Sequence, residues 1–418
     1  MERRKNLNDK FGFVVIMEEK TWINISNALL YQEGPGVRNT QYTTDGVKLL
    51  NVANLIDGKI DLSTSDRYIS CEEANGKYKH FLCDEGDLIV ASSGIKVDYV
   101  DKKMGFVTKE MLPLCMNTST IRFKVIDKRQ LNIRYFMYYL KSQNYKKQLS
   151  KLITGSAQLN YGPSHLEKIV FPLYKIEKQE EIVLKLDLIS KILEHNKIQI
   201  SKYDELIKAR FIEMFGDPEI NLMGWAKRPL SSVIVNANNG MARRGNDKDG
   251  NIVMRLVELQ DGYIDYSNPN RITLQDSEKK RYLLKDKDFL FARVNGNPNN
   301  VGRCAVFHDI GEDVYHNDHI IRVHFNELML NGTFASVLFN SDYGKQQLRG
   351  QIKTSAGQYT VSQDGIGAII AIMPPIELQN QFADFVKQVD KSKLAVQQSL
   401  EKTQLLFDSL MQEYFGEN

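Results

Sequence analysis

Four histidines cluster in the second half of the chain and could bind a metal ion. They are His308, His316, His319 and His324. His316 and His319 have a spacing that zinc ligands use, and imidazole is a common zinc ligand. The surrounding sequence instead predicts a turn and then a strand, in which these two side chains face opposite sides. The first half has no matching cluster, so we expect no metal site.

Other motifs for catalysis are missing from the sequence. The phosphate-binding pattern G-x-x-x-x-G-K-[ST] is absent, so ATP hydrolysis by this chain is not expected. Gly34-Pro35-Gly36 is rich in glycine but lacks the third glycine and the strand-to-helix context of a dinucleotide site. Pro374-Pro375 lacks the flanking residues that adenine methyltransferases usually carry. The cysteines are too few and too scattered for a disulfide framework or a zinc site, and they are expected to be reduced. They are Cys71, Cys83, Cys115 and Cys304.

Length and composition indicate a globular protein of two or three domains. The chain has 418 residues, of which 42% are hydrophobic and 26% charged. No run approaches the roughly 20 uncharged apolar residues that cross a bilayer. The apolar run at residues 11–17 is short and lacks small cleavage-site residues, so we expect a cytoplasmic protein. A net charge of +3 does not exclude DNA binding, because positive charge can concentrate on one face.

The elements that would position functional side chains are repeated along the chain at an offset of 200 residues. Residues 213–218 read EMFGDP and residues 413–418 read EYFGEN. Each glycine follows a helix-favouring segment in which apolar residues step by four and three, as in the seam of a coiled coil. The first seam is Ile182, Leu186, Ile189, Leu193, Asn196, Ile200, Tyr203, Ile207, Arg210 and Met214. The second is Phe382, Val386, Val389, Lys393, Val396, Leu400, Thr403, Phe407, Leu410 and Tyr414.

Both predicted helices are too long to stand alone. Each begins shortly after a proline, Pro172 or Pro374, since the residue before proline disfavours helix. A helix over residues 177–214 is roughly 57 Å long at 1.5 Å per residue. An exposed helix of that length needs a partner that buries its seam. We expect an antiparallel coiled coil between the two helices, with pseudo-two-fold symmetry. The alternative is that they are simply the last helices of two ordinary domains.

The globular parts repeat more loosely. Trp22 matches Trp225, and residues 57–61 match residues 261–265 as a turn before a strand. Residues 86–91 and 287–292 each predict a short apolar strand, and residues 155–158 match residues 355–358. Between these anchors the two halves diverge. A common frame with divergent loops suits a protein that reads two different ligands.

These features resemble the specificity subunits of type I restriction-modification systems. The junction at residues 214–218 (MFGDP), followed by Asn221 and Gly224-Trp225, is similar to the start of the second half in that family. Pro374-Pro375 and residues 378–382 (LQNQF) resemble its passage into the last helix. Lys20-Thr21-Trp22 departs from the family's Gly-Trp and follows a 20-residue lead, which puts the N-terminal boundary in doubt.

The resemblance covers nearly the whole chain and implies an α+β fold with two target recognition domains in tandem. The domains would span residues 1–174 and 217–375. A spacer helix would follow each domain, over residues 175–216 and residues 376–418.

The resemblance also implies a non-catalytic subunit that reads double-stranded DNA in two short sequences separated by a gap. The helix pair would set the length of that gap. Two methyltransferase subunits would bind S-adenosylmethionine and flip the target adenine. A restriction and translocase subunit would use ATP and Mg²⁺. No cofactor is expected on this chain.

Base reading needs Arg, Lys, Asn, Gln or Ser side chains on loops, and arginine and lysine also bind phosphates. The loop at residues 293–303 is the leading candidate, although Asn-Gly and Asn-Pro also form turns for local reasons. In the first half the candidates are Arg38, Asn39, Gln41, Ser92, Ser93, Lys96, Gln158 and Asn160. In the second half they are Arg243, Arg244, Asn246, Arg293, Asn295, Asn297, Arg303 and Gln358.

Three other functions would fit parts of the sequence. A fused nuclease and methyltransferase would need cofactor motifs that are missing. A coiled-coil adaptor would bind protein or glycan and show no sequence-selective DNA affinity. The specificity subunit of another multi-subunit modification system would share the same features.

Overall fold

The computed structural model describes residues 20–153, 160–355 and 357–417. The chain divides into two compact units. The first unit contains the described residues up to 195 together with residues 400–417, and the second unit contains those of 196–399. Each unit therefore takes part of both long helices. Among the described residues, no helix is both long and apolar enough to span a membrane.

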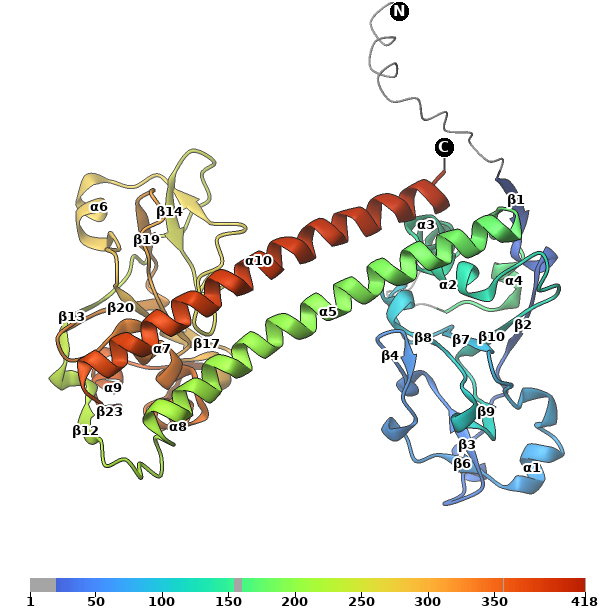
Figure 1. Cartoon of the computed structure of the whole chain (residues 1–418), viewed down its shortest axis with the longest axis horizontal. Coiled ribbons are helices and arrows are strands. Elements are labelled where there is room, and N and C mark those ends of the chain that lie inside the picture. The colour runs from blue at the N-terminus through green and yellow to red at the C-terminus, as the bar shows by residue number, and fades with distance from the viewer. Residues whose placement is uncertain (1–19, 154–159, 356, 418) are drawn as a thin grey trace, which may run out of the picture. The chain divides into compact units, whose positions relative to one another are not determined.

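A four-stranded antiparallel sheet forms the centre of the first unit (Figure 1). Its strands, in spatial order, are β2 (Leu29–Glu33), β10 (Thr120–Val125), β7 (Leu88–Ala91) and β8 (Met104–Phe106). Every residue of β7 is buried, as expected for a short apolar run without alternation. The predicted strand over residues 86–91 is therefore confirmed.

Smaller sheets flank this centre. One is three-stranded and mixed, because β3 pairs with β9 in parallel and with β6 antiparallel. The remaining strands pair as β1 with β11 and β4 with β5. These strands are β3 (Val47–Leu50), β6 (Tyr68–Ile69), β9 (Leu114–Met116), β1 (Thr21–Asn24), β11 (Val170–Leu173), β4 (Leu55–Ile56) and β5 (Lys59–Ile60). The β4–β5 hairpin turns at residues 57–58, where the sequence predicted a turn.

Helices of the first unit cover the central sheet with aromatic side chains. Tyr135, Phe136 and Tyr139 on α2 are fully buried in the same cluster as the central strands. The helices are α1 (Cys71–Asn75), α2 (Ile133–Lys141), α3 (Gln143–Leu152) and α4 (Pro163–Leu166). Asn132 and Ser142 cap α2 and α3, since their side chains accept backbone N–H groups of the first turn.

The second unit repeats the frame. Its four-stranded sheet has the order β13-β20-β16-β18, its mixed sheet the order β15-β14-β19, and β12 pairs with β23. As in the first unit, the mixed sheet has a single parallel pairing, here between β14 and β19. These strands are β13 (Ile234–Asn239), β20 (Ile320–Phe325), β16 (Phe289–Ala292), β18 (Cys304–Val306), β15 (Arg271–Ile272), β14 (Asn251–Met254), β19 (Val314–His316), β12 (Ala226–Pro229) and β23 (Ile370–Met373).

The second unit also contains a three-stranded antiparallel sheet in the order β17-β22-β21. Its strands are β17 (Val294–Asn295), β22 (Gln358–Thr360) and β21 (Lys353–Ser355). The short helices are α6 (Asp276–Tyr282), α7 (Gly332–Asn340), α8 (Asp342–Arg349) and α9 (Gln363–Gly367). The predicted fold class, two α+β globular parts in tandem along the chain, each followed by a long helix, is confirmed.

The long helices are α5 (Ile176–Phe215) and α10 (Ile376–Phe415), each 40 residues long. Their bounds differ by 200 residues, as the repeat predicted. All ten positions of each seam are buried or half-buried, and Ile182, Leu186 and Phe382 are completely buried. Gly216 ends α5 with φ of 72°, a left-handed conformation that glycine adopts without strain.

Within the second unit the two helices run antiparallel (Figure 1). Asn196 Nδ2 donates to Ser399 Oγ at 3.3 Å, and Asp204 pairs with Lys393 at 2.5 Å. Further along α5, the ring of Phe211 lies 5.6 Å from that of Phe382. As numbers rise along α5, those of the partners on α10 fall. In the first unit, Ile182 and Leu186 share a hydrophobic cluster with the end of α10.

Candidate nucleic-acid interface

The residue that follows the central strand, β7 in the first unit and β16 in the second, makes the same backbone hydrogen bonds in both units but has a different side chain. In the first unit, Ser92 N donates to Ser119 O at 2.8 Å, and Ser92 O accepts from Tyr161 N at 3.0 Å. In the second unit, Arg293 N donates to His319 O at 2.7 Å, and Arg293 O accepts from Val361 N at 2.9 Å. Ser92 and Arg293 therefore occupy equivalent positions.

In the second unit, arginines gather around the loop between β19 and β20. Arg293 Nη1 donates to Asp318 O at 3.0 Å, and Arg244 Nη2 lies 2.7 Å from Asp318 Oδ1. Arg244 Nη2 also lies 3.1 Å from His319 Nε2. Burial lowers the pKa of His319, and the charges of Arg244 and Arg293 add to this while Asp318 opposes it. The structure thus brings together two candidates that are about 50 residues apart in sequence.

The asparagine-rich loop of the second unit is held by its own side chains. Asn295 Oδ1 accepts from Asn297 N at 2.9 Å, and Asn297 Oδ1 accepts from Asn299 N at 3.0 Å. These are the local turns that asparagine favours. Among the described residues, the Nδ2 groups of Asn295 and Asn297 have no hydrogen-bond partner. They are donors that a ligand could reach.

Two arginine candidates of the second unit are already engaged. Arg303 pairs with Asp261 at 3.0 Å and donates to Gln260 and Asn300 at 3.0 and 2.9 Å. Arg243 Nη2 lies 2.7 Å from Glu278 and 2.7 Å from Thr273 O. Their guanidinium groups hold segments of the unit together. Either arginine could bind DNA only if it contacted DNA and its protein partners at the same time.

The other two candidates of the second unit are exposed. Asn246 follows the arginine pair in an exposed segment. Gln358 begins β22 beside Gly357, whose φ of 78° makes the turn from β21. The next residue of β22, Tyr359, pairs with Asn295 of β17. The pairing of β22 with β17 therefore places Gln358 beside the asparagine-rich loop.

The first unit brings its candidates around the equivalent loop, between β9 and β10. Ser93 Oγ donates to Ser119 Oγ at 2.6 Å, and Ser93 forms a β-bridge with Asn160. Ser92 is buried, whereas Asn160 and Lys96 are exposed. Gln158 lies outside the described residues. This edge carries Ser92 and Ser93 where the second unit carries Arg293 and Val294.

Arg38, Asn39 and Gln41 form a short turn on the same unit. Arg38 and Asn39 are exposed, and the side chain of Gln41 donates to Glu73 at 2.8 Å and to the Tyr78 hydroxyl at 3.1 Å. Immediately before the turn, Val37 N donates to Asn117 Oδ1 at 3.2 Å. Because Asn117 is two residues before Ser119, this turn reaches the same loop.

Sequence reasoning missed the two loops around which the candidates gather, at residues 117–119 and 317–319. Asn117 and Asn317 are both buried, and both side-chain oxygens accept backbone N–H groups within the loop. An identical asparagine at an offset of 200 directly before a repeated strand was the available signal. Asp318 and His319 were not selected because aspartate and histidine were not among the residue types considered for base reading.

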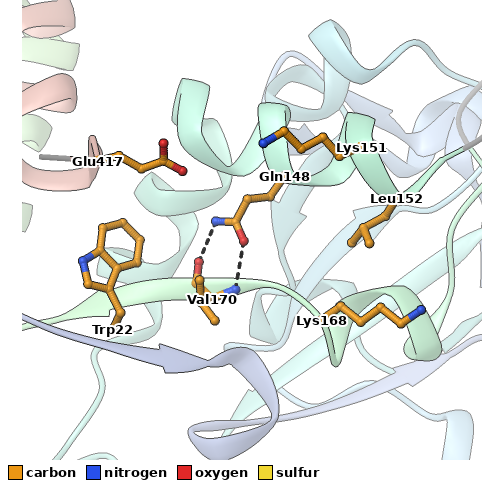
Figure 2. Close-up of a pocket in the computed structure, with 7 residues that line it drawn as sticks. All are labelled: Trp22, Gln148, Lys151, Leu152, Lys168, Val170 and Glu417. Atoms are coloured by element: carbon orange, nitrogen blue, oxygen red, sulfur yellow. Dashed lines mark hydrogen bonds between the residues drawn. The ribbon is translucent and has the colours of Figure 1, made fainter.

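A hollow in the first unit offers no arrangement for catalysis (Figure 2). Gln148 Nε2 donates to Val170 O at 2.8 Å and Gln148 Oε1 accepts from Val170 N at 3.1 Å, so this amide joins α3 to β11. Glu417 pairs with Lys147 at 3.5 Å. The hollow is lined by Trp22, Gln148, Lys151, Leu152, Lys168, Val170 and Glu417. The side chains of Gln148 and Glu417 are therefore engaged in structural contacts.

His316 is a core residue. It is fully buried at the end of β19, and its Nδ1 lies 3.1 Å from Tyr282 O. Burial lowers its pKa to about 4, so the imidazole is neutral near pH 7. In the described part of the chain, no group of three metal-ligating side chains occurs.

Two units with one backbone frame, different polar edges and paired long helices are the architecture expected of a recognition protein that reads two different ligands. Comparisons with known proteins identify the class more closely. Residues 41–202 match the family model described as the type I restriction modification DNA specificity domain.

Two curated relatives match most of the chain. The type I restriction enzyme StySPI specificity subunit of Salmonella potsdam is 24% identical over 388 residues, which cover 89% of this chain and 82% of the relative. The EcoKI specificity subunit of Escherichia coli is 21% identical over 389 residues, with the same coverage.

Solved structures agree in fold. The S subunit of a type I restriction-modification system from M. genitalium aligns with a TM-score of 0.56 at 15% identity, covering 97% of this chain and 98% of that one. A structure described for complex assembly of the type I R-M system aligns at 0.54 and 14% identity, covering 94% and 97%. Over most of its length the chain is therefore similar to the specificity subunits of type I restriction-modification systems, the non-catalytic DNA-recognition components of those systems.

Proposed function

We propose that this chain reads a DNA target in two parts, one with each unit. The observation that carries the proposal is the equivalence of Ser92 and Arg293. The same backbone hydrogen bonds hold both residues, yet the first unit has a small buried serine there and the second a half-buried arginine. Arginine pairs with guanine edges, whereas serine and asparagine suit other base edges. Two copies of one frame would thus read two different short sequences.

The paired helices would set the spacing between the two half-sites. Forty residues of helix extend about 60 Å at 1.5 Å per residue, and half-sites one DNA turn apart lie about 34 Å from one another. Leu193→Glu combined with Ile200→Glu would place charges in the seam, so we expect a changed gap length or loss of assembly. An unchanged gap in an intact complex would contradict the spacer role.

The chemistry of modification would belong to partners. The similarity to specificity subunits supports assembly with two methyltransferase subunits, which would bind S-adenosylmethionine and flip the target adenine. A restriction subunit using ATP and Mg²⁺ would complete the complex. This chain would supply the DNA sequence preference and the scaffold.

Mapping of N6-methyladenine in host DNA tests the proposal. The chain would be co-expressed with the methyltransferase encoded beside it, and a single motif with two defined parts and a fixed gap is expected. A motif without a gap would favour another kind of modification system. A stable complex without any motif would favour an adaptor and contradict DNA specificity.

A further inference from the structure

A pair of basic residues lies directly before the central strand region in both units, outside the edges described above. In the first unit the pair is Lys79 and His80, and in the second it is Lys280 and Arg281. All four side chains are exposed. The next residue is aromatic in each case. The ring of His80 lies 4.2 Å from that of Phe81, and the guanidinium of Arg281 lies 5.5 Å from the ring of Tyr282.

Backbone hydrogen bonds show that the two pairs are equivalent. Cys83 N donates to Leu114 O at 2.8 Å, and Leu284 N donates to Val314 O at 2.8 Å. One residue later, the N–H of Asp84 donates to the Asp87 carboxylate at 2.8 Å. Lys285 N makes the same bond to Asp288, also at 2.8 Å. The residues directly before these matched bonds therefore correspond one to one.

Local structure does not explain why both pairs are basic. In the second unit, Lys280 and Arg281 lie in the last turn of α6, where a cation is favoured by the helix dipole. In the first unit, Lys79 and His80 lie beyond α1 in a separate 3₁₀ turn (Lys79–Phe81). Neither Lys79 nor Lys280 forms an ion pair with any residue that the structure describes. The shared charge has no shared structural cause.

Each pair lies next to a candidate DNA-reading segment. In the second unit, Glu278, two residues before Lys280, holds Arg243 at 2.7 Å. In the first unit, Glu73 and Tyr78 hold Gln41, and Tyr78 directly precedes Lys79. In both units a helical carboxylate that precedes the basic pair therefore holds a side chain of the reading segment.

We infer that Lys280 and Arg281 in one unit, and Lys79 with His80 in the other, bind the phosphodiester backbone of duplex DNA. The inference rests on the proposed function. The two pairs hold the backbone beside each half-site, while the loop side chains meet base edges. Such contacts carry no sequence information, but each releases a counterion and makes binding depend on salt.

Salt titration of DNA binding tests the inference. The full chain, co-purified with its methyltransferase partner, would be titrated by fluorescence anisotropy with a motif duplex and a scrambled duplex of equal length. Each phosphate contact contributes about 0.9 to the slope of log K against log salt. Lys280→Ala with Arg281→Ala should lower the slope by about two and weaken binding about 30-fold near 150 mM salt. Lys79→Ala should lower it by about one.

Matched variants separate this effect from loss of folding or of general charge. Lys280→Arg should keep the wild-type slope. Arg228→Ala removes an exposed cation from β12, where the equivalent residue of the first unit is Ile23. That substitution should leave the slope unchanged.

The outcomes distinguish the inference from the proposed function. Unchanged slopes for both basic-pair variants would overturn the inference. A loss confined to the motif duplex would overturn it as well, because it would indicate base reading. If wild type prefers neither duplex, the proposed function fails, and the slopes on the scrambled duplex still decide whether these residues bind phosphate.

Discussion

The ends of β7 and β16 show how one frame can carry two different polar edges. Both strands are continuous apolar runs, LIVA and FLFA, and every residue in them is buried. Directly after each strand, the backbone makes the same two hydrogen bonds, but one unit has a small buried serine and the other an arginine that reaches Asp318. Because burial and backbone bonding fix the position, the side chain there is free to vary.

The mixed sheets also share a backbone position at which the two units have different side chains. Met116 pairs with Leu50 at the end of β9, and His316 pairs with Met254 at the end of β19. Both side chains are fully buried. One is a flexible apolar side chain and the other a neutral imidazole. The units are therefore equivalent in architecture, and we expect them to differ in their response to pH.

Removal of the last phenylalanine of either long helix should give the largest effect on stability. Phe215 packs against Phe211, Phe334 and Phe382, and Phe415 packs against Tyr135. Both are fully buried, so Phe215→Ala and Phe415→Ala should each cost about 3–5 kcal/mol in free energy of unfolding. Urea denaturation of the full chain would measure both. A small cost for only one would break the equivalence of the two helix ends.

Acid should destabilise the second unit more than the first through His316. Its pKa is lowered to about 4 in the folded state, below the ordinary value of about 6.5. Above about pH 6.5 His316 is neutral in both the folded and the unfolded chain, so it does not reduce stability. As the pH falls from about 6.5 towards about 4, protonation in the unfolded chain lowers the free energy of unfolding by up to about 3 kcal/mol. His316→Met, which copies Met116, should remove this dependence. Unfolding measured between these pH values would refute the prediction if wild type and variant lost stability equally.

Arg293→Ala should weaken specific DNA binding by about 1–3 kcal/mol if the guanidinium reads a base. The loss should alter preference only in the half-site that the second unit reads. Binding to duplexes with single changes in either half-site would measure it. Equal affinity and unchanged preference would remove Arg293 from the interface.

Substitution of Asn196, a polar residue in the helix seam, should have the smallest effect on stability. Asn196 Nδ2 donates to Ser399 Oγ at 3.3 Å, and Asn196 is half-buried whereas Ser399 is exposed. Asn196→Ala should therefore change the free energy of unfolding by about 0.5 kcal/mol or less. A loss of several kcal/mol in thermal or urea unfolding would show that this pair fixes the register of the helices.

The long helices and the repeated strands could be predicted from sequence because their signals are periodic. The heptad step marked positions such as Leu186 and Val386, which are buried. The apolar runs before Ser92 and Arg293 marked the central strands. Both signals depend only on neighbouring residues along the chain.

The geometry of the polar edges could not be predicted, because its partners are distant in sequence. Arg244 meets Asp318 and His319 only after β13 and β20 have paired. The engagement of Arg303 by Asp261 and Gln260 depends on a loop 40 residues earlier. Composition marked these residues as candidates, but only the folded chain shows which of them have partners.

Exchange of the globular part of the first unit tests the central claim most directly. Residues 20–170 would be replaced by the corresponding segment of a similar specificity subunit, with both long helices unchanged. The chimera would be co-expressed with the methyltransferase, and N6-methyladenine would be mapped across host DNA. One half of the motif should change, while the other half and the gap stay the same. A change in both halves, or in neither, would contradict two independent readers on one frame.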